Sequence, residues 1–113
     1  GALRINALWD MTNSGNNKIP RIRLGGISGT IFFQSTGTTS GSYSEFGRVI
    51  QNAGSASAQI SKYLGTTIGF SSQPGTTGSV NTAVAQDLVF TGQLANSGET
   101  ITIKQYSVEL ILP

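Results

Sequence analysis

Apolar and polar residues alternate along the segment from residue 2 to residue 11. Five apolar side chains at odd positions share one face of this segment, namely Leu3, Ile5, Ala7, Trp9 and Met11. Arg4, Asn6 and Asp10 lie on the other face, and only Leu8 breaks the pattern. Because successive side chains of a strand point to opposite sides, residues 2–11 are predicted to form a half-buried β-strand.

A second alternating segment, residues 18–26, follows the small polar residues TNSGNN. Ile22 and Leu24 are expected to face inward, and Arg21 and Arg23 outward. Pro20 has no amide hydrogen to donate, so it is expected at the beginning of this strand or at a sheet edge.

The same arrangement occurs near the C-terminus, where alternating segments at 87–94 and 99–112 flank Asn-Ser-Gly at 96–98. With the first Asn-Ser-Gly at 13–15, two similar hairpins are predicted. The apolar positions of the last segment change from odd (Ile101, Ile103) to even (residues 106, 108, 110 and 112). This change at Lys104–Gln105 predicts a β-bulge or a bend between sheets.

The middle of the chain begins with a short predicted strand, residues 29–35, which contains adjacent Phe32 and Phe33. Neighbouring side chains of a strand face opposite sides, so one ring is expected to point away from the core. That ring predicts a subunit contact, and we expect a homotrimer in which Phe32 and Phe33 form the interface.

The segment 43–64 is compatible with two strands around 52–54 or with one strand and a helical turn. Residues 66–72 are predicted to be a strand, 73–79 a loop and 80–84 a further short strand. Strands at roughly ten-residue spacing without a convincing helix predict one all-β domain over residues 1–113. We expect an antiparallel, jelly-roll-like β-sandwich of about eight strands.

The composition argues against several classes of function. Only 11% of the 113 residues are charged, and the seven Lys and Arg residues are scattered, which is not typical of nucleic-acid binding. The chain has no Cys and no His, so the common general base, thiolate nucleophile and zinc ligands are absent. The five carboxylates form no recognisable pair or calcium loop. We therefore expect no enzyme activity, metal or cofactor, and no apolar run is long enough to insert into a membrane.

The polar middle of the chain contains the candidate ligand-binding residues. Tyr43 and Tyr63 could offer aromatic faces to a sugar, and Asn52 and Gln59 could hydrogen-bond its hydroxyl groups. The loop 71–79 adds further hydroxyl and amide groups. Because binding residues are commonly carried by loops on a rigid scaffold, a ligand site is predicted between residues 43 and 78.

Two blocks at the ends of the chain carry a resemblance to a known family. The first consists of Leu3, Ile5, Trp9, Thr12, Asn13, Ser14, Asn16, Asn17, Lys18, Arg21, Arg23, Leu24, Gly25 and Gly26. The second consists of residues 92–102 and 106–110. Together they resemble a β-domain at the C-terminal ends of tailed-bacteriophage virion proteins of the tail-fibre, tail-spike and head-decoration types.

The resemblance implies a trimeric domain of a longer protein, made in the host cytoplasm and carried on the exterior of the virion with other virion proteins. It implies attachment to a host-surface receptor, a glycan or a protein, at the tip of a fibre or spike. The alternative is a structural head-decoration or fibre-assembly domain without a host ligand. A carbohydrate-binding module attached to an enzyme is a third reading. Aromatic residues outside the core would favour binding, whereas apolar strand faces used for subunit contacts would favour the structural role.

Overall fold

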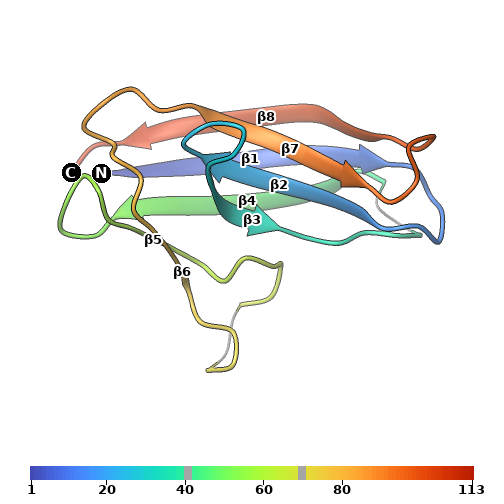
Figure 1. The fold of residues 1–113 in the computed structure, drawn as a ribbon, viewed down its shortest axis with the longest axis horizontal. Coiled ribbons are helices and arrows are strands. Elements are labelled where there is room, and N and C mark those ends of the chain that lie inside the picture. The colour runs from blue at the N-terminus through green and yellow to red at the C-terminus, as the bar shows by residue number, and fades with distance from the viewer. Residues whose placement is uncertain (40–41, 69–70) are drawn as a thin grey trace.

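A computed structural model describes residues 1–39, 42–68 and 71–113 of the chain. These residues form eight strands and no helix (Figure 1). The strands are β1 (Ala2–Met11), β2 (Lys18–Leu24), β3 (Thr30–Gln34), β4 (Ser44–Asn52), β5 (Gln59–Ser61), β6 (Thr76–Gly78), β7 (Leu88–Leu94) and β8 (Ile101–Ile111). The prediction of an all-β protein with about eight strands is confirmed.

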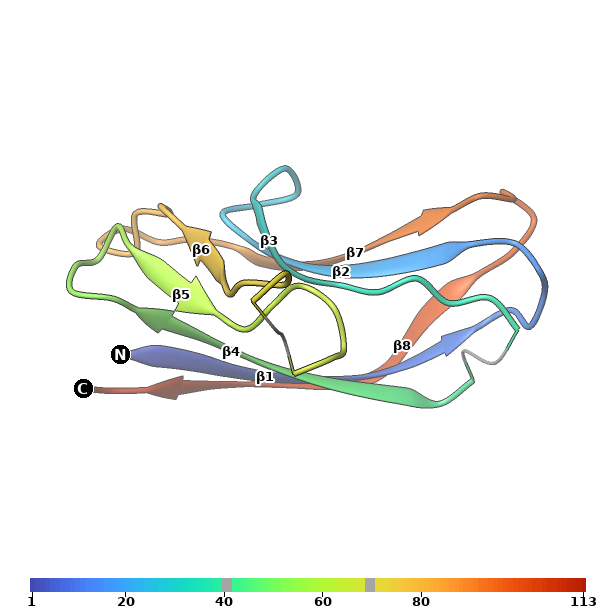
Figure 2. The ribbon, with the colours of Figure 1, turned by 90° about the horizontal axis from the view of Figure 1, so that it is seen from below.

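The strands form two antiparallel sheets that pack face to face (Figure 2). The large sheet has the order β6-β5-β4-β1-β8, and the small sheet has the order β3-β2-β7. The first strand pairs with the last in the large sheet, and the second pairs with the seventh in the small sheet. This nesting of pairs gives the sandwich its jelly-roll-like character, and both termini lie at one end of the molecule.

The two Asn-Ser-Gly segments do not close hairpins, so that prediction is wrong. β1 pairs with β4 and β8, whereas β2 pairs with β3 and β7, so each segment carries the chain from one sheet to the other. The two crossovers lie side by side: the Thr12 amide donates to the Thr100 carbonyl at 3.1 Å, and the Ala95 amide donates to the Asn17 carbonyl at 3.0 Å.

The core lies between the sheets and uses the predicted face of β1. Ile5, Ala7, Trp9 and Met11 are buried, and half-buried Leu3 packs against the cluster that contains Ile5. The small sheet contributes buried residues at alternate positions of β2, including Ile22 and Leu24. Pro20 lies third in β2, near the beginning of the strand as predicted, although β2 is the central strand of its sheet.

The predicted bulge in the last strand is confirmed. Leu8 lies opposite Gln105 and Trp9 lies opposite Ile103, which leaves Lys104 without a partner across the ladder. The extra residue moves the inward positions of β8 from odd to even numbers, as the apolar pattern indicated.

A second bulge corrects the prediction for Phe32 and Phe33. Ile22 lies opposite Phe33 and Arg23 lies opposite Ile31, so Phe32 is the extra residue in β3. Both rings are buried, with exposed fractions of 0% and 1%, and neither points away from the core. The bulge interrupts the alternation between neighbouring side chains, which was the basis of the prediction. The two rings therefore leave no surface for a subunit contact.

The first of the two alternatives for residues 43–64 is confirmed, because they contain two strands, β4 and β5. The rest of the middle of the chain differs from its prediction in three places. The predicted loop 73–79 contains the short strand β6, and the predicted strand 80–84 is a turn. No strand occurs in the described part of 66–72, of which residues 69 and 70 lie outside the described residues.

Hydrogen bonds from other loops explain the turn at 80–84. The Thr82 amide donates to the Ala56 carbonyl at 2.8 Å. Both backbone groups of Val80 bond the side chain of Gln59. The backbone groups of Val80 and Thr82 therefore bond to other loops and to a side chain, and not to a neighbouring strand.

Candidate functional site

The described residues bring no group of three or more His, Cys, Asp or Glu side chains together. Nor do they include a helix that could cross a membrane. The candidate functional features are therefore the hollows and the uncovered faces of the sandwich.

Two of the predicted ligand residues, Asn52 and Gln59, lie together. The Gln59 amide donates to Asn52 Oδ1 at 3.3 Å and to the Val80 carbonyl at 2.8 Å, and its Oε1 accepts from the Val80 amide at 2.8 Å. Gln59 is buried, with an exposed fraction of 2%. Its hydrogen-bonding groups are used by the protein, so the role that the structure gives it is to hold the chain at Val80.

The two predicted tyrosines lie in different places. Tyr43 immediately precedes Ser44, the first residue of β4. Tyr63 lies two residues after Ser61, which pairs with Ile50 near the other end of β4. Ser44 and Ile50 are six residues apart on β4, which is about 20 Å along a strand. Tyr43 is exposed and has a positive φ of 51°. The four predicted residues therefore do not form a single site.

Tyr63 lines a hollow that we call the polar groove, of about 340 Å³. One wall is the chain that leaves β3, and the other is the chain that follows β5. The lining residues are Gln34, Ser35, Thr36, Tyr63, Leu64, Gly65, Thr66, Thr67 and Gln73. Hydroxyl and amide groups predominate among these side chains. Residues 63–67 and Gln73 lie within the range 43–78 in which a ligand site was predicted, whereas Gln34, Ser35 and Thr36 lie outside it.

Hydrogen bonds from the backbone and from two cationic side chains hold the two walls of the polar groove in place. The backbone N–H of Gln34 donates to the Leu64 carbonyl at 2.9 Å. Arg48 Nη2 donates to the carbonyls of Leu64 and Gly65, each at 3.0 Å, and Lys62 Nζ donates to the Thr66 carbonyl at 3.0 Å. Three successive carbonyls of one wall are therefore bound by the cationic side chains of Arg48 and Lys62.

Arg48 is a buried cation that sequence reasoning missed. Its guanidinium carbon lies 5.0 Å from the centre of the Phe33 ring. Nε and Nη1 have no hydrogen-bond partner among the described residues. Burial lowers the pKa of Arg48, and desolvation, together with the charge of Arg48, lowers the pKa of Lys62. The available signal was the position of Arg48, two residues from both Phe46 and Ile50, which places it on the same face of a strand as these apolar side chains.

The inner face of β8 carries an uncovered apolar surface, which we call the β8 stripe. It consists of Tyr106, Val108 and Leu110, with exposed fractions of 62%, 43% and 69%. These residues lie opposite Ala7, Ile5 and Leu3 and so share the core-facing side of the large sheet. The Tyr106 ring packs against Phe90 of β7 at 5.3 Å between ring centres, which makes the stripe continuous with the core.

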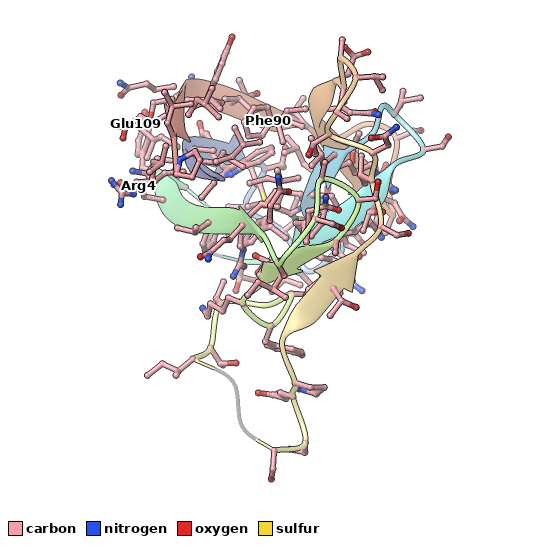
Figure 3. All side chains as sticks on the ribbon, turned by 90° about the vertical axis from the view of Figure 1, so that its left-hand side faces the viewer. Arg4, Phe90 and Glu109 are labelled. Carbon is pink, nitrogen blue, oxygen red and sulfur yellow. The ribbon has the colours of Figure 1, made fainter. Side chains whose placement is uncertain are left out.

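The stripe lies on β8, which is an edge strand of the large sheet. Figure 3 shows the opposite, outer side of the large sheet, where Arg4 and Glu109 lie, with Phe90 between the sheets. Arg4 and Glu109 form an exposed ion pair at 3.6 Å. At the end near the termini, Leu110 also lines a hollow of about 430 Å³ with Leu3, Leu24 and Ile50.

Comparison with known proteins found no match among protein-family models, curated proteins or solved structures.

Proposed function

We propose that this chain is a subunit-contact domain of a tailed-phage virion protein, of the fibre-assembly or head-decoration kind. The virion assignment comes from the resemblance of the two terminal blocks. The observation that carries the structural role is the β8 stripe, an apolar strand face on the core side of the sheet that the described chain leaves in contact with solvent. Such a face is typical of a surface that another chain covers.

The partner that fits the stripe best is another copy of the same chain. The three residues of the stripe carry no charge, and the charged residues of β8 are Lys104 and Glu109. Glu109 lies on the outer side of the sheet, where it pairs with Arg4. The same stripe from several copies can therefore meet around an axis without burying an unpaired ion. The free edge of β8 adds backbone groups that a neighbour can bond. Three copies is the number that the resemblance implies.

The proposal is tested by the mass of the 113-residue chain in solution, measured by light scattering after size-exclusion chromatography. We expect a trimer for the unmodified chain and a monomer for the double variant Val108→Thr/Leu110→Thr, in which both new residues are β-branched and suit a strand. The control is Ile27→Thr, which removes an exposed apolar side chain outside β8. A monomeric unmodified chain, or an assembly that the double variant leaves intact, would contradict the proposal.

The virion assignment has a separate test. Peptides of this chain should be found by mass spectrometry in particles purified from a lysate of its phage. Their absence from particles that contain the other structural proteins would contradict the assignment.

A further inference from the structure

We infer that the polar groove binds a neutral saccharide. This inference goes beyond the subunit contact and does not depend on it, because the groove lies beside β3 and β5, away from β8 in the order of the strands. A saccharide site would serve the host attachment that the resemblance implies.

The chemistry of the lining side chains selects the class of ligand. Among the described residues, the groove is lined by Ser and Thr hydroxyls, by two Gln amides and by one Tyr, and by no charged side chain. Hydroxyl and amide groups can both donate and accept hydrogen bonds, which suits the hydroxyl groups of a sugar. An acidic saccharide would find no cationic side chain in the lining to pair with its charge.

The two amides of the groove are oriented as donors. Gln34 Oε1 accepts from Arg21 Nε at 2.7 Å, and Gln73 Oε1 accepts from Thr67 Oγ1 at 3.1 Å. Each amide therefore uses its oxygen within the protein, while its NH₂ group makes no hydrogen bond within the described part of the chain. A ligand that offers hydroxyl oxygens would satisfy both NH₂ groups.

Tyr63 supplies the aromatic surface of the groove. Its half-buried ring rests against Gly65, where a β-carbon would lie only 2.9 Å from Tyr63 Cε1. A side chain at position 65 would therefore displace the ring from this wall. The half-buried ring offers apolar area to the C–H groups of a sugar.

The groove is formed before any ligand arrives. Arg48 and Lys62 hold the carbonyls of residues 64–66 on one wall, and the bond from Gln34 to Leu64 joins the two walls. A volume of about 340 Å³ is at the lower end of the range of small-molecule sites, which is about 300–1,000 Å³. One groove is therefore expected to bind weakly, and several copies on one particle would add avidity.

The test uses the methyl glycosides of glucose, galactose, mannose and N-acetylglucosamine, with methyl glucuronide as the acidic comparator. Binding to the 113-residue chain is measured by saturation-transfer-difference NMR. At least one neutral glycoside should give a saturable signal, and the glucuronide should bind more weakly than that glycoside. In Tyr63→Ala the affinity for that neutral glycoside should be lower by about tenfold or more.

Two further variants separate binding from folding. Thr36→Trp fills the groove from an exposed position without removing a packed side chain, and it should abolish the signal while the circular dichroism spectrum stays unchanged. Tyr43→Ala is the matched control, because it removes an exposed tyrosine outside the groove and should leave binding unchanged. The inference is overturned if no neutral glycoside binds, if the glucuronide binds more tightly, or if Thr36→Trp binds as well as the unmodified chain. These outcomes leave the mass of the assembly, and so the proposed subunit contact, unaffected.

Discussion

The ammonium group of Lys18 lies 3.4 Å from a carboxylate oxygen of Glu99, and this ion pair joins the two crossovers between the sheets. The Lys18 side chain is completely buried, and its Nζ also donates to the Asn16 carbonyl at 2.7 Å and to Ser14 Oγ at 3.0 Å. Asn16 Nδ2 donates to the other oxygen of Glu99 at 2.9 Å. Residues more than eighty positions apart in the sequence thus share one polar network at this end of the sandwich.

Removing the charge of Glu99 is expected to destabilise the fold more than removing an exposed carboxylate does. In Glu99→Gln the buried ammonium of Lys18 loses its counter-ion, which is costly in a site shielded from water. We expect a lower Tm than for the unmodified chain, and a partial recovery when Lys18→Met is added. The control is Glu45→Gln, at an exposed position of β4. Equal melting temperatures for the two single variants would contradict this role of the pair.

Stability is also expected to depend on pH through Glu99. Hydrogen bonds from the side chains of Ser14 and Asn16, together with the charge of Lys18, hold the pKa of the Glu99 carboxyl below its ordinary value, although desolvation acts in the other direction. A lowered folded-state pKa adds stability above the unfolded value of about 4.3, and this stability is lost as the pH falls through the lower folded-state pKa. Urea denaturation at a series of acidic pH values should show a shallower pH dependence for Glu99→Gln. Identical dependences for the two chains would exclude this contribution.

Both rings of the Phe32–Phe33 pair are expected to matter for folding. Because each is fully buried, Phe32→Ala and Phe33→Ala should each lower the free energy of unfolding by about 3–5 kcal/mol. Chemical denaturation measures this change. If either substitution left stability unchanged but altered the mass of the assembly, the ring would lie at a subunit interface after all.

Two glycines offer a sharp comparison of close packing with open space. A β-carbon at Gly78 would lie 2.6 Å from Phe32 Cζ and 3.2 Å from Gln59 Oε1, so Gly78→Ala should cost about 1–3 kcal/mol through overpacking. A β-carbon at Gly15 would meet no atom within 4 Å, and Gly15→Ala should change stability by less than about 0.5 kcal/mol. Denaturation midpoints of the two variants check the difference, and a reversed order would contradict the packing described for β6.

The sequence by itself determined the features that depend on neighbouring residues. Alternation identified the long strands β1, β2, β7 and β8 and the buried face of β1, because a strand turns its side chains with a period of two. The bulge at Lys104 was predictable because apolar residues occupy odd positions before it and even positions after it. The bulge at Phe32 was not predictable, because β3 has only five residues. Such a short strand has too few apolar positions on either side of the bulge to show that their phase changes.

Only the tertiary structure decided which strands pair and which surfaces are covered. Asn-Ser-Gly has the same local turn chemistry in a hairpin and in a crossover, so the partners of β1 and β2 depend on distant segments. Tyr63 was identified from sequence as a candidate, but the facing wall of its groove comes from the end of β3, through the bond between Gln34 and Leu64. The even-numbered apolar positions of the stripe follow from the sequence pattern, and they face the inner side of the large sheet. The stripe stays in contact with solvent, and whether the opposite sheet covers a residue is a property of the packed sheets and not of the residues next to it.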